Sequence, residues 1–261
     1  MPPSEGRRSE GRGSGRGGGR TPQRGIPKGP LLAFDTSSPR GSVALARDRT
    51  VLARAVLPHQ GQHASQLIPA IDGVLARSGI TMGEVQGVVV GEGPGSFTGV
   101  RVAAATAQGL ARALNLPVWG VPSLAAAALS RSRDRDASVP GPLLPSSWDP
   151  WPIYILFDAR SDRIYGACYR VKGGLETVVE PHGGTISQVL AGPLPRGVRF
   201  AGSGAVAHRA LLEEAGHSVA EDAEGEPTAD GLLRYMSLES PAPKEDAGGW
   251  EPLYIRAPSI S

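Results

Sequence analysis

Residues 91–101 read Gly-Glu-Gly-Pro-Gly-Ser-Phe-Thr-Gly-Val-Arg, and no other part of the sequence constrains the fold so strongly. They follow a β-branched run over 85–90, which predicts a strand, and they precede a segment rich in small residues that predicts a helix to about Leu114. Ser96 or Thr98 can cap that helix. A glycine-rich turn between a strand and a helix places free backbone N–H groups where an anion can bind.

The glycine pattern differs from the two common phosphate-binding motifs. Pro94 interrupts the path expected of a dinucleotide-binding fingerprint, and position 96 holds serine where that fingerprint needs glycine. No Gly-Lys-Ser/Thr follows, which excludes a Walker A loop. A phosphate-binding loop and a purely structural turn therefore both stay open for this stretch.

The flanking residues predict alternating strands and helices. Upstream, an apolar run over 31–34 ends in the turn Asp-Thr-Ser at 35–37, and strands over 42–46 and 51–56 complete a meander. Apolar residues at helical spacing predict a helix over 64–75, which Pro69 should kink. Further strands are predicted over 118–121, 153–157, 163–170 and 198–201, with helices over 123–129, 204–212 and from about 230, the last capped by Thr228 or Asp230.

Two short motifs recur and predict a duplicated fold. Phe34-Asp35-x-x-Ser38-x-Arg40 matches Phe157-Asp158-x-x-Ser161-x-Arg163, and Gly-x-Gly before a helix occurs at 91–93 and again at 202–204. Two related α/β lobes of this kind are typical of the actin-like ATPase architecture, in which a cleft between the lobes binds a nucleotide. A chance match is the alternative, because the motifs are short, and turn capping is the commoner role for both aspartates.

In the actin-like architecture, seven residues are expected to form a vestigial nucleotide cleft. They come from the Asp-Thr-Ser turn and from the glycine-rich stretch: Asp35, Thr36, Ser37, Gly93, Gly95, Ser96 and Thr98. No catalytic residue, no metal site and no required cofactor is expected. His59 and His63 are four residues apart, but Pro58 and Gly61 disfavour a helix that would present both to a metal.

Composition and charge narrow the class of protein. The chain has 261 residues, a formal net charge of +2 and one cysteine, Cys168, so no internal disulfide can form. We expect a cytoplasmic protein with no membrane segment and no secretory signal. Residues 1–30 are rich in glycine and arginine and are expected to be disordered, with RNA binding by this tail as the weaker alternative. Residues 31–130 and 151–261 are expected to form the two lobes, joined by a linker over 131–150.

The stretch 91–101 closely resembles the signature of the TsaB (YeaZ) family. The turn at 34–37, the helix start at 63–71, Pro-Val-Trp-Gly-Val-Pro-Ser-Leu at 117–124 and Glu-Pro-Leu-Tyr-Ile-Arg at 251–256 also resemble landmarks of that family. The resemblance implies an actin-like (ASKHA) fold and a role beside TsaD. TsaD transfers a threonylcarbamoyl group, from the adenylate made by TsaC, to an adenosine next to the anticodon of tRNA. TsaE is the third partner, and TsaB is understood as a scaffold.

The resemblance also separates this chain from the related TsaD. TsaD carries two metal-binding histidines, four residues apart on a helix, after a Gly-Val pair. The matching stretch here begins at Gly120-Val121 and has Ser123 and Ala127 in those places. Neither side chain offers the imidazole that a transition metal prefers. The resemblance therefore implies a non-catalytic subunit that contacts tRNA only through the complex. A freestanding actin-like ATPase or kinase is the alternative.

Two helices are expected to form the partner surface. In the family, the corresponding helices bind TsaD as a heterodimer, or a second TsaB when TsaD is absent. The expected contact residues are Leu67, Ile71, Arg101, Ala104 and Gln108. Weak nucleotide binding is expected either in the cleft or at this interface. If these helix faces only cover the sheet, the assignment fails.

Overall fold

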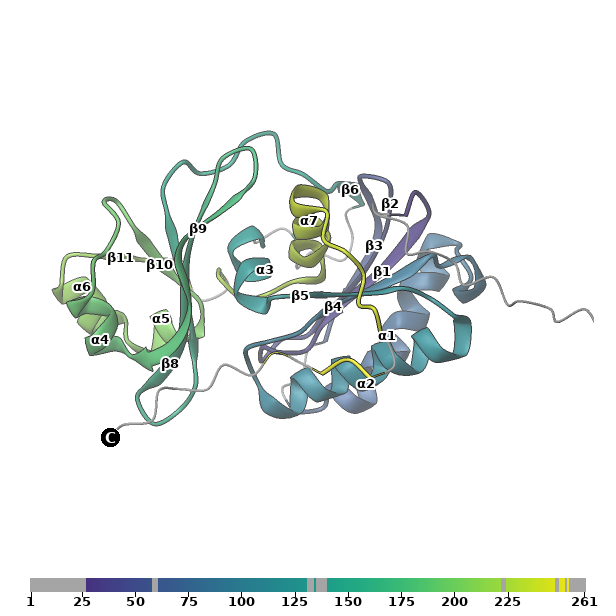
Figure 1. Cartoon of the computed structure of the whole chain (residues 1–261), viewed down its shortest axis with the longest axis horizontal. Coiled ribbons are helices and arrows are strands. Elements are labelled where there is room, and N and C mark those ends of the chain that lie inside the picture. Colours follow the sequence, from purple (N-terminus) through teal and green to yellow (C-terminus); the bar gives the residue numbers. More distant parts are fainter. Residues whose placement is uncertain are drawn as a thin grey trace, which may run out of the picture.

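The computed structural model describes residues 27–57, 61–130, 134, 140–221, 224–246, 249–251 and 253. Two sheets, each with its own helices, lie at either end of the long axis, and helices α3 and α7 lie between them (Figure 1). We call the half that contains β1 the N-lobe and the half that contains β7 the C-lobe. His59, Arg131–Arg133 and the Arg/Gly tail over 1–26 lie outside the described residues.

The N-lobe sheet has the strand order β5-β4-β1-β2-β3-β6. Strands β1 to β3 form an antiparallel meander, and β4 and β5 continue the sheet in parallel from β1. The strands are β1 Pro30–Asp35, β2 Ser42–Arg47, β3 Thr50–Val56, β4 Gly87–Gly91, β5 Val118–Val121 and β6 Gly141–Pro142.

The C-lobe sheet has the strand order β11-β10-β7-β8-β9. Strands β7, β8 and β9 are antiparallel, and β10 and β11 continue in parallel from β7. The strands are β7 Ile153–Asp158, β8 Arg163–Val171, β9 Leu175–Thr185, β10 Arg199–Ala201 and β11 Ser218–Val219.

The two sheets have the same topology. In each, the first strand is central, the second and third pair with it as a meander on one side, and the fourth and fifth are parallel on the other side. Asp35 ends the first strand of one lobe and Asp158 ends the first strand of the other. The predicted duplication and the actin-like fold class are therefore confirmed.

Helices α1 and α2 cover one face of the N-lobe sheet. Helix α1 is His63–Ser78, contains Pro69, and ends at Gly79, whose φ of 67° is the left-handed conformation that glycine adopts readily. Helix α2 is Phe97–Leu114, and Ser96 caps it by accepting a hydrogen bond from Gly99 N at 3.3 Å. The other helices are η1 Met82–Glu84, α3 Ser123–Leu129, α4 Ile186–Ala191, α5 Ser203–Ala207, α6 Arg209–Glu214 and α7 Ala229–Glu239.

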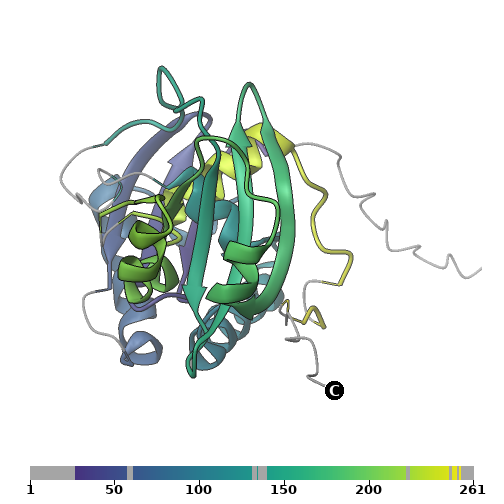
Figure 2. The same cartoon turned by 90° about the vertical axis from the view of Figure 1, so that its left-hand side faces the viewer.

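Helices α3 and α7 exchange lobes. Helix α3 follows an N-lobe strand but packs its Leu124 into the cluster on the C-lobe sheet. Helix α7 follows the C-lobe strands but packs Leu232 and Met236 against the N-lobe sheet. Each of these helices thus packs on the lobe that its neighbouring strands in the chain do not form. Strand β6, which joins the N-lobe sheet, lies within the expected linker over 131–150. In Figure 2 the C-lobe sheet lies in front, with the other lobe behind it.

Buried ion pairs fix α7 between the lobes. Arg234 is almost fully buried, contacts both carboxylate oxygens of Asp134, and donates to Leu143 O at 2.7 Å. One turn earlier, Asp230 pairs with Arg54 of β3 at 2.7 Å. Buried pairs are costly to break, because the remaining charge is left without compensation. None of the helices within the described ranges is long and apolar enough to cross a membrane.

Candidate functional site

Asp35 lies at the end of β1 as the centre of a buried hydrogen-bond cluster. One carboxylate oxygen accepts from Ser37 N and from Ser37 Oγ, each at 2.7 Å. The other accepts from Ser123 Oγ at 2.9 Å. The residue has no exposed surface, and burial raises the pKa of its carboxyl, opposed by the hydrogen bonds from Ser37 and Ser123. The site thus begins with a carboxyl that is sealed from solvent.

The glycine-rich stretch is fastened directly to the Asp-Thr-Ser turn. Thr36 Oγ1 donates to Gly99 O at 2.6 Å, and Ser96 N donates to Ser37 O at 2.7 Å. Gly93 N donates to Ser123 Oγ at 3.1 Å, so the same serine that contacts Asp35 also holds the loop. The two motifs therefore form one unit, although about 60 residues separate them in the sequence.

The glycines of this stretch permit close backbone approach. A Cβ on Gly91 would overlap the Asp35 carboxylate, and one on Gly99 would overlap the carbonyl oxygen of Thr36. Gly93 has a φ of 93°, which also favours glycine. Packing between the loop and the turn thus accounts for glycine at positions 91 and 99.

An open cleft of about 530 Å³ lies between the lobes. Of the seven residues predicted for it, Ser37, Gly95, Ser96 and Thr98 line the cleft. Asp35, Thr36 and Gly93 do not line it, and both Asp35 and Thr36 have no exposed surface. The structure brings all seven together as one unit but presents only four to the cleft.

Charges around the cleft are mixed. Arg160 lies among the lining residues together with the carboxyl groups of Asp158 and Glu226, so the lining has no excess of positive charge. A polyphosphate is normally held by an excess of positive charge or by a metal ion. Nucleotide binding in this cleft therefore stays a prediction, and within the described residues no cluster of three or more His, Cys, Asp or Glu could hold a metal.

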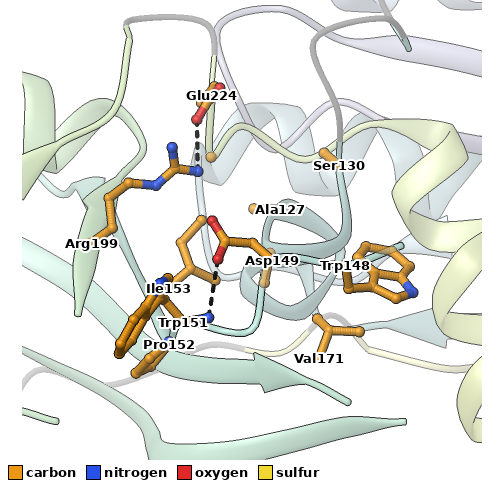
Figure 3. A pocket seen from close by; sticks show the side chains of 12 residues that line it. Ala127, Ser130, Trp148, Asp149, Trp151, Pro152, Ile153, Val171, Arg199 and Glu224 are labelled. Atoms are coloured by element: carbon orange, nitrogen blue, oxygen red, sulfur yellow. Dashed lines mark hydrogen bonds and ion pairs between the residues drawn. The ribbon is translucent and has the colours of Figure 1, made fainter. Parts of the chain in front are cut away.

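A second, smaller pocket of about 150 Å³ was not predicted from the sequence (Figure 3). It lies where α3 ends and β7 and β10 begin. Arg199 pairs with Glu224 at 3.0 Å across it, and Asp149 accepts a hydrogen bond from Trp151 N at 3.1 Å. Its residues come from five separate segments, none of which carries a motif, so the sequence holds no signal for it.

The structure corrects part of the predicted partner surface. Leu67 and Ile71 of α1 are each only 1% exposed and pack into the core against the sheet, and Ala104 of α2 is also buried. Arg101 is exposed as expected, whereas Gln108 is partly buried and donates to Trp250 O at 2.6 Å. The assignment of the first three is wrong because the apolar stripe that sequence periodicity detects is the one that faces the sheet.

A different set of residues faces outward on these helices. We define the docking face as the exposed residues Ile68 of α1 and Phe97, Arg101, Ala105 and Gly109 of α2. Ile68 is 48% exposed and Phe97 is 58% exposed, with the Arg101 guanidinium 3.7 Å from the centre of the Phe97 ring. Phe97 also lines the cleft between the lobes, so the docking face begins at the rim of that cleft. The regular spacing of four residues along α2 could have identified this ridge.

Two duplicated lobes around a cleft define the class of protein: the chain has the actin-like ATPase fold. Two solved structures from Pseudomonas aeruginosa, an uncharacterized protein with similarity to peptidase YeaZ and YeaZ, superpose with TM-scores of 0.70 and 0.69. Each is 27% identical and covers 87% of this chain and 100% of that chain. The family model described as "TsaD: tRNA N6-adenosine threonylcarbamoyltransferase" matches residues 51–209. The chain belongs to the wider family that this model describes and, within it, to the TsaB (YeaZ) family.

Individual relatives support this assignment. The chain is 34% identical over 140 residues to "tRNA threonylcarbamoyladenosine biosynthesis protein TsaB" of Escherichia coli, covering 54% of each protein. It is 32% identical over 151 residues to the Bacillus subtilis protein of the same name, covering 58% of this chain and 59% of that protein. The chain thus matches a little over half of the length of these TsaB proteins. An uncharacterized Mycobacterium tuberculosis protein is 31% identical over 231 residues, covering 87% of this chain and 92% of the relative.

Proposed function

We propose that this chain is a non-catalytic subunit of a tRNA threonylcarbamoyladenosine biosynthesis complex and that it binds a TsaD-type transferase. The relatives named TsaB and the match to the TsaD family model support this role in tRNA modification. In this proposal TsaE is a further partner, and tRNA contacts the chain only through the complex. No cofactor is required by this chain.

Helix α3 provides the observation that carries the proposal. Positions 123 and 127, where TsaD is expected to hold two metal-binding histidines, are Ser and Ala, and both are buried. The Ser123 hydroxyl donates to Asp35 and accepts from Gly93 N, so it is occupied in holding the fold together. In this chain both side chains are buried by packing between the lobes and neither is a metal-binding histidine. This supports the role of a binding partner rather than that of the transferase.

The alternative, a freestanding ATPase or kinase, has less support. Such an enzyme would need the Asp35 carboxylate in contact with a metal-bound water beside the nucleotide. Asp35 instead lies beneath the loop without exposed surface, and the cleft lining carries no excess of positive charge. The buried state of this carboxyl therefore favours a structural role.

The docking face suits a helical partner. Helix α2 presents small residues at Ala105 and Gly109 beyond the exposed Phe97 ring, so a partner helix can approach closely and seat an apolar group against the aromatic side chain. Aromatic and arginine side chains contribute most to many interfaces. We therefore place the TsaD contact on this face, and in the absence of TsaD a second copy of the chain binds there.

A binding experiment with the TsaD of the same organism tests the proposal. Phe97→Asp removes an exposed ring from the docking face, and Leu211→Asp, on the exposed surface of α6 in the other lobe, is the matched control. Size-exclusion chromatography with light scattering should show a complex of one copy each for wild type and the control. The Phe97 variant should bind about 100-fold more weakly.

Measuring tRNA modification and ATP turnover with the same proteins distinguishes a non-catalytic partner from a freestanding enzyme. TsaD with TsaE and the threonylcarbamoyl adenylate should modify tRNA only when this chain is present, and Phe97→Asp should lower that yield in proportion to complex formation. The isolated chain should show no ATP turnover. ATP turnover by the isolated chain, without any complex with TsaD, would sink the proposal and support the ATPase alternative.

A further inference from the structure

The segment after α7 wraps around the open edge of the N-lobe sheet. We call residues 241–253 the C-terminal strap; residues 247, 248 and 252 within it are outside the described part. The strap leaves α7 on one face of the sheet, passes β5, and reaches α2 on the other face (Figures 1 and 2). It therefore connects the helix between the lobes to the helix that carries most of the docking face.

Its first half closes the edge strand. Pro241 O accepts a hydrogen bond from Trp119 Nε1 at 3.2 Å, and Lys244 N donates to Val118 O at 2.8 Å. Both contacts are made to β5, the last strand of the sheet. Edge strands are commonly covered in this way, because their free backbone groups invite pairing with other chains.

The strap is also attached to the signature loop, through two contacts with Glu92. Lys244 Nζ pairs with Glu92 Oε2 at 2.6 Å, and Leu253 N donates to Glu92 O at 2.8 Å. The Lys244 ammonium also lies 5.5 Å from the centre of the Trp250 ring. Glu92, one residue into the signature, thus holds the strap through both its side chain and its backbone.

The strap lies along α2. Gln108 Nε2 donates to Trp250 O at 2.6 Å, and the Trp250 side chain packs against the same core cluster that α1 and α2 cover. Gln108 neighbours Gly109 of the docking face, so the strap contacts α2 beside that face. Beyond the edge strand, the strap thus also contacts the signature loop and the helix that carries most of the docking face.

We infer that the C-terminal strap is a third element of the docking face, so that a TsaD-type partner seated on α1 and α2 also contacts the strap. This inference rests on the proposed function. Leu253 is 40% exposed, and its backbone is held against the loop that leads into Phe97. Glu245, Asp246 and Glu251 of the strap are exposed. The partner therefore presents an apolar patch opposite Leu253, flanked by basic side chains opposite these carboxylates.

Full-length variants in the TsaD binding assay test the inference. Leu253→Asp changes an exposed side chain without disturbing the backbone contact to Glu92, and Leu211→Asp again serves as the matched control. We expect Leu253→Asp to weaken binding to TsaD about tenfold, because a charge replaces an apolar contact at the rim of the interface, and the control to bind as wild type. Lys244→Gln, which releases the ion pair to Glu92, should weaken binding by a smaller factor.

The outcomes separate this inference from the proposed function. Binding of Leu253→Asp within twofold of wild type, together with loss of binding by Phe97→Asp, would overturn the strap contact and leave the proposed function standing. Failure of the wild-type chain to bind TsaD at all would overturn both. Equal weakening by Leu253→Asp and Leu211→Asp would show a general charge effect and would likewise overturn the strap contact.

Discussion

The two lobes place the same aspartate at the end of the same strand and give it opposite surroundings. Asp35 of the N-lobe is fully buried and accepts three hydrogen bonds, from Ser37 and Ser123. Asp158 of the C-lobe is exposed, lines the cleft, and accepts one hydrogen bond from Arg160 N at 2.8 Å. Equal positions in a duplicated fold therefore do not imply equal chemistry.

The signature loop accounts for the difference between the lobes. In the N-lobe it folds over the Asp-Thr-Ser turn, with glycines where a side chain would collide with Asp35 or Thr36. The C-lobe has only Gly202-Ser203-Gly204 before the short helix α5, and Ser203 Oγ reaches the backbone N–H of Asp158 at 3.1 Å rather than its carboxyl. The C-lobe aspartate consequently stays in solvent.

The largest effect that we predict comes from removing each aspartate in turn. Asp35→Ala leaves three buried donor groups of Ser37 and Ser123 without an acceptor, and it should lower the free energy of unfolding by about 3 kcal/mol. Asp158→Ala removes one exposed hydrogen bond and should cost about 0.5 kcal/mol. Urea denaturation of both variants under identical conditions measures the difference. Equal losses in the two lobes would contradict the account of the loop as a seal.

The pH dependence of stability provides a second test of the difference between the buried Asp35 and the exposed Asp158. Burial raises the pKa of Asp35 above its ordinary value of 3.8, so the folded state holds this proton more tightly than the unfolded chain does. Stability from this group is complete below pH 3.8 and is lost as pH rises through the raised pKa. Asp35→Asn cannot titrate, so wild type should lose stability relative to this variant as pH rises from about 4.

Thermal unfolding of wild type and Asp35→Asn between pH 4 and 8 measures this difference, with Asp158→Asn as the control in the other lobe. The control should show no such trend, because its carboxyl is exposed. A wild-type chain that gains stability over Asp35→Asn as pH rises would mean that hydrogen bonds outweigh burial and that the pKa of Asp35 is lowered.

The sequence predicted the elements of the N-lobe well because its patterns are regular. The strand over 118–121 and the end of α2 at Leu114 were placed correctly, and Ser96 is the cap. In the C-lobe, β9 was missed, since its residues are mostly half-buried or exposed and end in His182-Gly183-Gly184 without an alternating pattern. The exchange of α3 and α7 between lobes was also missed, because periodicity identifies an apolar face but not the sheet that it covers.

The sequence grouped the residues of the candidate site but did not predict which of them are exposed. The sequence brought the Asp-Thr-Ser turn and the glycine-rich stretch together as one cleft, and the structure confirms that they are in contact. Burial of Asp35 depends on Ser123, which lies 88 residues away in sequence, and no local pattern reports such a contact. Leu67 and Ile71 were misplaced for the related reason that an amphipathic helix shows its buried face most clearly.

The smallest predicted effect concerns the turn that the repeat motif shares. Ser38 and Ser161 hold equivalent places in the motif, but Arg160, Ser161 and Asp162 all have positive φ, with values of 67°, 51° and 59°. The N-lobe turn has Pro39 where the C-lobe has Asp162, and proline fixes φ near −65°, so the N-lobe turn cannot adopt this left-handed run. The shared motif therefore contains two different turns.

Glycine at the two serine positions should act with opposite sign. Ser161→Gly relieves a left-handed conformation and should raise the free energy of unfolding by about 0.5 kcal/mol. Ser38→Gly loses the hydrogen bond from Ser38 Oγ to Arg40 O and adds freedom to the unfolded chain, so it should lower that free energy by about 1 kcal/mol. Denaturant titration of the two variants decides the matter: a loss of stability in both would mean that the C-lobe turn carries no strain at Ser161.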